Sequence, residues 1–431
     1  MTATLDVTPF ADLAAQSLES GPAGAAREAA FARFAAVGIP TSKDEEWRFT
    51  PVRHLGSTRY VAPAASPRLT ESDIAPYLVG TPEYRVIVVD GRVDVGLSRL
   101  GSAGGLRVAA LSGAGATGAT SITCAGDSAT ITTTPFAALN AALWTDGAAL
   151  HVADGTTIDT PIEILHLATA AASNAVVTPR TVLCVGAGAR ATVVESFVSL
   201  TSEPYFTNTA CEIVMEEGAW LEHARIQRES LAATHIGLTT VHQATESHYR
   251  SFTLALGAKV SRHNLHAHLD APNVESLLYG LYIGRGEQLL DNHTAIFHDH
   301  PDCNSWEVYK GVLADKSHGV FNGKVIVQPA AQKTDAKQTN RNLLLSDTAK
   351  VDTKPQLEIF ADDVKCTHGA TVGKLNEQQR FYLRTRGIAG REAELMLITA
   401  FVAEVLAEIT HPGVREVCDG LVRAEIDALV G

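Results

Sequence analysis

The fold of this chain is decided by runs such as Ala191-Thr-Val-Val-Glu-Ser-Phe-Val198, a short segment rich in β-branched residues. Two further examples are Ser251-Phe-Thr-Leu-Ala-Leu256 and Lys324-Val-Ile-Val-Gln328. Such runs follow one another from residue 148 to residue 373, almost without helical periodicity. Short β-branched runs separated by turn residues are typical of strands, so we predict a mainly β architecture for this region.

Turn residues recur through the same region at loosely regular intervals of 28 to 39 residues, at Gly188, Gly218, Gly257, Gly286, Gly319 and Asp347. No repeated sequence accompanies the spacing. Many short strands at such intervals favour a β-solenoid, in which each coil buries its inner face against its neighbours. A β-sandwich is the alternative, because alternation of residues alone does not determine topology.

Helical patterns flank the strand region. Residues 1–80 are predicted to form an N-terminal helical region, 81–147 a mixed α/β lead-in, 148–373 the β-solenoid core and 374–431 a C-terminal helical domain. In the C-terminal domain, apolar residues recur at helical spacing and form a stripe on one helix face, made of Leu395, Ile398, Val402, Val405 and Ile409. Leu397 and Phe401 lie beside this stripe and widen it. A second helix, Val414–Val430, or a partner surface would bury it.

Composition excludes several classes of protein. The 431 residues include 48 acidic and 35 basic ones, for a net charge of −13, which disfavours nucleic acid as a partner. No apolar run is long enough for a membrane helix, and the first residues lack the pattern of a signal peptide. We therefore expect a soluble, cytoplasmic protein that has no membrane partner.

The cysteine pattern also excludes some sites. Six scattered cysteines without a C-x-x-C pair argue against a disulfide framework or a self-contained zinc or iron–sulfur site. Cys184 and Cys211 lie in apolar runs and are predicted to be small core residues.

Two segments imitate nucleotide-binding motifs. Gly186 and Gly188 resemble a dinucleotide fingerprint, but the residues that follow are strand-like where a helix is required. The segment Gly319–Val325 has the wrong glycine spacing for a P-loop, and Val325 replaces its Ser or Thr. We predict that this chain has no nucleotide site, so that any ATP hydrolysis belongs to a partner.

Histidines are concentrated in one region, with 11 of the 16 between His223 and His318. The groups His263–His268 and His298–Cys303 are candidate metal sites. On strands, His266 and His268 would share one face, as would His298 and His300, with His263 on the opposite face. Stacked or hydrogen-bonded surface imidazoles are the simpler interpretation, and the role of both groups is left open.

The most informative segment contains Lys365-Cys-Thr-His368. Two residues apart on a strand, Cys366 and His368 would lie on one face. A thiolate beside an imidazole suits iron, iron–sulfur or persulfide chemistry. Two ligands do not hold a cluster, so the missing ones would come from another chain. The simpler alternative is a core cysteine beside a surface histidine.

Four motifs, in order along most of the chain, resemble the SufD family, the paralogue of the SufB family in the SUF iron–sulfur cluster assembly system. They are Asp44-Glu-Glu-Trp-Arg-Phe-Thr50 after Pro40, His298-x-x-Pro-x-Cys-x-Ser305 with Tyr309-Lys-Gly-Val-Leu313, Lys365-Cys-Thr-His-Gly-Ala-Thr-Val-Gly373, and Phe381-Tyr-Leu-Arg-Thr-Arg-Gly-Ile388. SufB-like chains carry an essential cysteine where this sequence reads Thr339-Asn-Arg-Asn-Leu-Leu-Leu345. The resemblance is therefore to SufD.

This resemblance implies a right-handed parallel β-helix flanked by N- and C-terminal helices. It implies a non-catalytic scaffold that pairs with a SufB-like paralogue through the β-helix and docks a SufC-like ABC ATPase through its C-terminal domain. A transient iron–sulfur cluster would form at the paralogue interface, with His368 as candidate iron ligand and Cys366 beside it. The partner-docking residues would be Phe381, Tyr382, Arg384, Arg386, Leu397 and Phe401.

Other hypotheses remain open at this point. A carbohydrate-active β-helix enzyme would need converging carboxylates in a groove. A histidine-rich metalloenzyme would hold metal in the isolated subunit. A SufB-like homodimeric scaffold is opposed by the absent cysteine, although self-dimerisation of the isolated chain is left open. The iron donor, the cluster type, and direct binding of iron or a flavin are not determined by the sequence.

Overall fold

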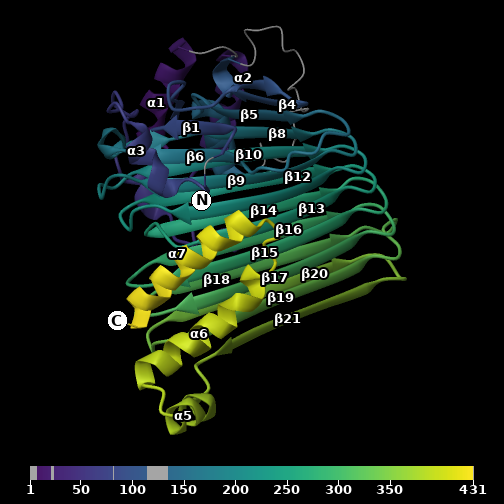
Figure 1. Cartoon of the computed structure of the whole chain (residues 1–431). Helices are drawn as coiled ribbons and strands as arrows, with labels where there is room; N and C mark the ends of the chain where they lie inside the picture. The colour runs from purple at the N-terminus through teal and green to yellow at the C-terminus, as the bar shows by residue number, and fades with distance from the viewer. Residues whose placement is uncertain (1–6, 21–23, 81, 114–133, 431) are drawn as a thin grey trace.

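The computed structural model is a β-solenoid with helices at both ends, and it describes residues 7–20, 24–80, 82–113 and 134–430 (Figure 1). Two long sheets face each other, and consecutive strands of the central coils alternate between them. Strand β11, for example, pairs in parallel with β9 on one side and β13 on the other. The predicted solenoid is therefore confirmed, and the β-sandwich alternative is wrong.

From β9 onward, the ten-stranded sheet is built from the odd-numbered strands. In spatial order it contains β2 (Arg92–Val93), β1 (Arg85–Val89), β6 (Ile162–Ala168), β9 (Arg190–Ser199), β11 (Trp220–Arg228), β13 (His248–Ala255), β15 (Glu275–Gly284), β17 (Asn304–Leu313), β19 (Asp335–Leu344) and β21 (Lys365–Gly373). Strand β9 continues directly from the Gly186–Gly188 turn, so the described structure has no helix where a dinucleotide fingerprint would need one.

The eleven-stranded sheet lies opposite. It contains β3 (Gly101–Ala103), β4 (Leu106–Ala110), β5 (Gly147–Val152), β8 (Arg180–Val185), β10 (Phe206–Met215), β12 (Thr234–Gln243), β14 (Val260–Leu269), β16 (Leu289–His298), β18 (His318–Val327) and β20 (Lys350–Ile359), with β7 (Val176–Val177) beside β10. The segment Gly319–Val325 lies inside β18, which confirms that it is not a P-loop.

Alternation along each strand builds the interior. Every second side chain points between the sheets, and residues such as Leu221, Val241 and Ile296 are fully buried there. Glycines with positive φ, including Gly188 (65°) and Gly218 (66°), form the turns between coils. The prediction of a turn at Gly319 is wrong, because Gly319 lies within β18. A Cβ atom at this position would approach side-chain atoms of Tyr282 and Leu313 to 2.9 Å.

Helices at the N-terminal end cover the outer faces of both sheets. On the eleven-stranded sheet lie α1 (Thr8–Ser20), α2 (Gly24–Val37), η1 (Glu45–Trp47), η2 (Arg53–Gly56) and α4 (Pro135–Leu143). On the ten-stranded sheet lie α3 (Glu71–Ile74) and η3 (Ala75–Tyr77). Two further short helices are η4 (Leu111–Gly113) and η5 (Ala170–Ala172). Phe10, Trp47 and Phe136 pack with Phe206 of the sheet. Strand β1 pairs in parallel with β6, so the sheet extends into residues 81–147.

The C-terminal elements α5 (Glu377–Thr385), α6 (Gly390–Leu406) and α7 (Pro412–Val430) follow β21. Helices α6 and α7 lie across the outer face of the ten-stranded sheet (Figure 1). Ile398, Val402 and Val405 of the predicted stripe pack there, together with Val414 and Cys418 of α7. The apolar stripe is thus buried by the neighbouring helix and by the sheet.

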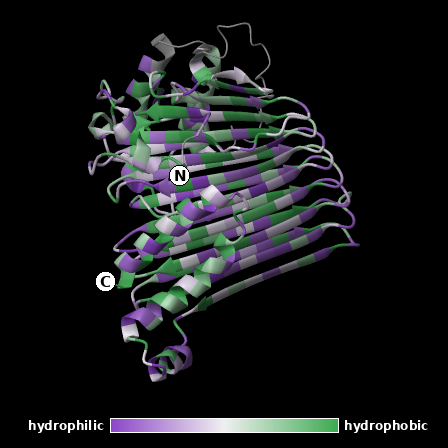
Figure 2. Cartoon of the chain, in the orientation of Figure 1, coloured by the Kyte–Doolittle hydropathy of each residue, from purple (hydrophilic) through white to green (hydrophobic). Residues whose placement is uncertain are grey.

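Figure 2 shows how hydropathy follows this arrangement: apolar and polar residues alternate along the strands of the solenoid. In the described part of the chain, no helix combines the length and apolar character needed to cross a membrane.

Candidate functional site

The segment with Cys366 and His368 forms β21, the last strand of the ten-stranded sheet. Strand β21 pairs with β19 on one side, and its other edge has no strand partner among the described residues. Every residue of β21 except Cys366 is exposed, and Cys366 is half-buried. This strand therefore presents backbone hydrogen-bonding groups and side chains at one end of the solenoid.

The two predicted site residues lie on the same face of β21. Cys366 is paired with the buried Ala336 and packs against the interior core. His368, two residues further, faces the same interior side, in register with Gln338. Burial raises the pKa of the Cys366 thiol, whereas the His368 side chain is exposed. The prediction that they share a face is confirmed; their roles remain predictions.

Two buried polar residues that were not predicted from the sequence lie behind His368. Gln338 is in register with Glu307 of β17, and its Nε2 donates a 2.7 Å hydrogen bond to Glu307 Oε2. Burial raises the pKa of Glu307 to about 7. His368 thus ends an internal row of stacked polar side chains. Gln338 and Glu307 could have been found only from their inward positions on neighbouring strands, and these positions follow only once the register between the strands is known.

The two ends of the solenoid differ in how they are closed. At the N-terminal end the outermost strands, β2 and β3, have only 2 and 3 residues. At the C-terminal end β20 and β21 are full edge strands of 10 and 9 residues. Ile359, Phe360 and Val372 are exposed there, by 39%, 60% and 48%. Long exposed edges with apolar residues are normally covered in native proteins.

The predicted partner-docking residues fall into two groups. Phe381 and Tyr382 on α5 are 68% and 58% exposed, and no residue of α5 is buried. Arg384 on the same helix and Arg386, directly after its end, are also exposed, and the Arg386 guanidinium lies 5.2 Å from the centre of the Tyr382 ring. Helix α5 therefore presents an exposed surface of aromatic and basic side chains.

On α6, Leu397 and Phe401 are half-buried. Phe401 packs against the apolar layer beneath the helix, and Lys310 Nζ lies 4.8 Å from its ring centre. Part of the Phe401 surface is therefore used by internal packing.

The His263–His268 group is divided between the two faces of β14, as predicted. His263 points inward and lies 3.0 Å from Thr239 Oγ1. His268 points outward, stacked between His242 and Phe297, with its ring 11° from parallel to His242. Parallel imidazoles direct their lone pairs side by side rather than at one ion. This arrangement supports the stacked surface interpretation over a metal site, although Asp270 lies nearby.

The second histidine group requires a correction. Strand β16 ends at His298, so His300 lies in the following turn and does not share a strand face with it. His298 is completely buried and lies 2.9 Å from Ser305 Oγ, and Cys303 is also buried. Cys184 is another correction, because it is only half-buried, whereas Cys211 is a core residue as predicted.

A cavity of about 760 Å³ lies between the Asp44–Trp47 segment and the outer face of the eleven-stranded sheet. Its lining includes Trp47 and Arg262, whose guanidinium stacks 3.8 Å from the Trp47 ring centre. Arg262 also donates to Asp291 at 3.0 Å, and His293 lies 3.4 Å from Glu46. These charged groups bind one another, so they join the N-terminal segment to the solenoid.

Comparisons with known proteins agree with the geometry. Residues 167–401 match the family model described as SUF system FeS cluster assembly, SufBD core domain. The chain is 33% identical over 382 residues to the iron–sulfur cluster assembly protein SufD of Escherichia coli, with 88% of each chain covered. It is also 33% identical over 396 residues to an iron–sulfur cluster assembly SufBD family protein of Synechocystis, covering 89% of this chain and 86% of that one.

Proposed function

Because the chain belongs to the SufBD family of iron–sulfur cluster assembly proteins and is a homologue of SufD, we propose that it is a non-catalytic scaffold subunit. In this proposal its last coil pairs with a SufB-like paralogue and its C-terminal helices dock a SufC-like ABC ATPase. The nascent iron–sulfur cluster is then cargo, built where β21 meets the paralogue.

The observation that carries the proposal is the uncovered C-terminal end of the solenoid. Within the described part of the chain, the outer edges of β20 and β21 have no strand partner, and Ile359 and Val372 are exposed beside them. A second β-helix would extend both sheets and bury these residues in one contact. A second copy of this chain would also fit this edge, and the isolated subunit is therefore proposed to self-associate weakly.

The donor set on β21 supports assembly at an interface. His368 supplies an exposed imidazole and Cys366 a half-buried thiol, and both are suitable ligands for iron. A four-iron or two-iron cluster needs more ligands than these two. The paralogue would supply the remaining ligands, so neither chain would hold the cluster alone.

Helix α5 supports docking of a separate ATPase. Phe381 and Tyr382 expose large apolar rings next to Arg384 and Arg386. Exposed aromatic residues flanked by arginines are typical of the centre of a protein interface. We infer that ATP-driven movement of the bound partner is transmitted through α6 and α7, which are packed on the ten-stranded sheet.

The experiment that tests the scaffold role is co-expression with the neighbouring SUF genes, followed by mass measurement and iron and sulfide analysis. We expect His368→Ala to leave the complex intact, because His368 is exposed and surface substitutions change stability by about 0.5 kcal/mol or less. Cluster content should be lost. The matched control is Thr367→Ala, an exposed neighbour on the opposite face of β21. Wild-type cluster content in His368→Ala would refute the site.

ATPase docking is tested separately with Phe381→Ala combined with Tyr382→Ala. Both side chains are largely exposed, so the variant should fold normally and still pair with the paralogue, but lose the ATPase on size exclusion. Thr399→Ala, an exposed change on α6, serves as control. Retention of the ATPase by the double variant would contradict docking through α5.

A further inference from the structure

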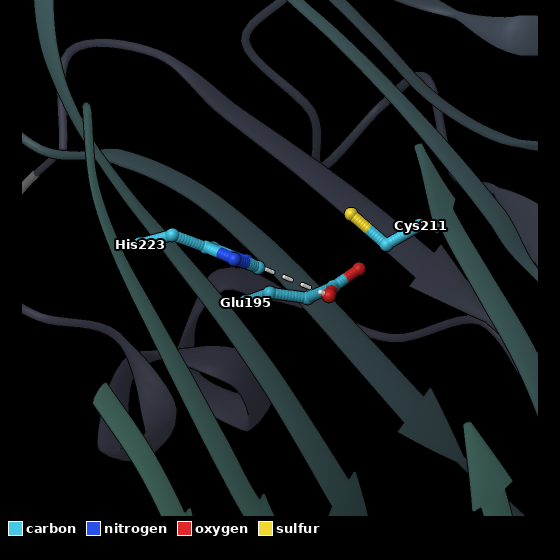
Figure 3. A group of neighbouring side chains, drawn as sticks. All are labelled: Glu195, Cys211 and His223. Atoms are coloured by element: carbon cyan, nitrogen blue, oxygen red, sulfur yellow. Dashed lines mark ion pairs between the residues drawn. The ribbon is translucent and has the colours of Figure 1, made fainter. Parts of the chain in front are cut away.

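The interior of the solenoid contains three side chains that are typical metal ligands. Glu195 on β9, Cys211 on β10 and His223 on β11 project into the space between the sheets (Figure 3). Their exposed fractions are 3%, 4% and 2%. Cys211 belongs to the sheet opposite to the one that carries Glu195 and His223, so the three donors meet across the interior.

The donor atoms are close together. The Cys211 sulfur, a Glu195 carboxylate oxygen and a His223 ring nitrogen all lie within 4.8 Å of one another. Glu195 Oε2 is 3.9 Å from His223 Nε2, which is longer than a hydrogen bond. Donors around a tetrahedral ion are separated by roughly 3.3–3.8 Å, given metal–ligand bonds of about 2.0–2.3 Å. Closing of the group by roughly 1 Å would bring these three donors to the spacing of such a site.

Surrounding residues orient two of these donors. Thr181 donates a 2.7 Å hydrogen bond to Glu195 Oε1, and His166 Nε2 lies 3.1 Å from the same oxygen. The Tyr249 hydroxyl lies 3.2 Å from His223 Nδ1. Because these contacts engage Glu195 Oε1 and His223 Nδ1, they direct Glu195 Oε2 and His223 Nε2 toward each other. Contacts of this kind hold histidine and carboxylate ligands in known metal sites.

The charges in this part of the interior also favour a cation. The carboxylates of Glu195 and Glu229 both interact with the guanidinium of Arg225, which lies 4.7 Å from the centre of the Phe197 ring. These three charged groups sum to −1. A divalent ion bound by the Cys211 thiolate would add +1, so that the group becomes neutral. A buried charge that has no compensating partner is costly, and the bound ion would neutralise the net charge of this group.

We propose that Glu195, Cys211 and His223 form a buried site for one divalent transition-metal ion of the Fe²⁺, Co²⁺ and Zn²⁺ class. Thiolate, imidazole and carboxylate together suit these ions better than Mg²⁺ or Ca²⁺. Binding breaks the S–H bond of Cys211, forms a sulfur–metal bond and releases the proton to solvent, with no change of oxidation state. The site is separate from the edge that carries His368, and the ion enters as the solenoid folds.

The test uses Co²⁺ as an optical probe on the full-length chain. The protein is unfolded in denaturant with a chelator, then refolded with or without Co²⁺ under anaerobic conditions and desalted. We expect about one equivalent of Co²⁺ per chain, a thiolate-to-cobalt charge-transfer absorption, and a raised melting temperature. Cys211→Ser should lose the absorption and the shift in melting temperature. Cys303→Ser is the matched control, because Cys303 is also buried.

Two further variants keep the test decisive if Cys211→Ser does not fold. Glu195→Gln and His223→Gln change less volume, and each should lower the retained Co²⁺ by about tenfold or more. Circular dichroism establishes that each variant is folded before its metal content is compared. The proposal is overturned if the refolded wild type retains no Co²⁺, or if Cys211→Ser keeps the charge-transfer absorption.

Discussion

Glu222 is the residue whose removal should most clearly separate the C-terminal helices from the solenoid. It lies on the outer face of β11 and is 1% exposed. Its carboxylate accepts hydrogen bonds from the backbone N–H groups of Thr410 (2.7 Å) and His411 (3.2 Å) and from the Thr410 hydroxyl. These residues form the turn between α6 and α7, and the carboxylate also faces the positive N-terminal end of α7.

The effect of Glu222→Ala follows from these contacts. A hydrogen bond to a charged group contributes about 1.5–3 kcal/mol, and the contributions of neighbouring bonds are not additive. Water replaces part of what is lost, because Thr410 and His411 are not fully buried. We expect the docking of α7 on the sheet to weaken by about 3 kcal/mol, which is a roughly hundredfold change in its opening equilibrium.

Amide hydrogen exchange measures this opening directly. Peptides covering Val414 to Ile426 should exchange about a hundredfold faster in Glu222→Ala, because these α7 residues are buried only while the helix is docked. Peptides from the interior strands, such as β14, should exchange as in the wild type. Glu222→Gln, which keeps an acceptor oxygen but loses the charge, should give an intermediate rate.

The matched control is Glu408→Gln, which removes the carboxylate in the ion pair with Arg250 (3.0 Å). That carboxylate is 40% exposed, so its loss should cost at most about 1 kcal/mol. If Glu222→Ala accelerated exchange in α7 no more than Glu408→Gln does, the reasoning that this buried carboxylate fastens the helix pair would be refuted.

Two other predictions concern stability. Trp47→Ala should lower the free energy of unfolding of the N-terminal region by about 3–5 kcal/mol, because the ring is buried beneath Arg262. Chemical denaturation measures this loss, with Trp47→Phe as the control. A loss below about 1 kcal/mol would contradict this packing. The pKa of Glu307 is about 7 in the folded state and about 4.3 in the unfolded state. Between about pH 4.3 and pH 7, the folded state therefore binds more protons than the unfolded state. Wild-type stability should therefore fall as pH rises from about 4.3 to 7, by roughly 3 kcal/mol at most. Glu307→Gln should remove this part of the pH dependence, and identical pH profiles for the two proteins would count against a protonated Glu307.

Several features were predictable because they depend on neighbouring residues. The β-branched runs became strands, and the Asp90-Gly91 dipeptide formed the tight turn between β1 and β2, both residues with positive φ. The shared face of Cys366 and His368 also followed from local geometry, because side chains alternate along any strand. Two of these local predictions were wrong. Gly319 was predicted to lie in a turn but lies within β18, and His300 was predicted to lie on a strand but lies in the turn after β16.

Only the tertiary structure decided what lies opposite each of these side chains. Gln338 and Glu307 stack behind His368 because β17, β19 and β21 are neighbours in one sheet. Glu195, Cys211 and His223 meet because β10 belongs to the opposite sheet. The sequence by itself determines strands, turns and the face on which each residue lies, since these depend on adjacent residues. Register between coils depends on turn lengths and packing summed over the whole solenoid, so it exists only in the folded chain.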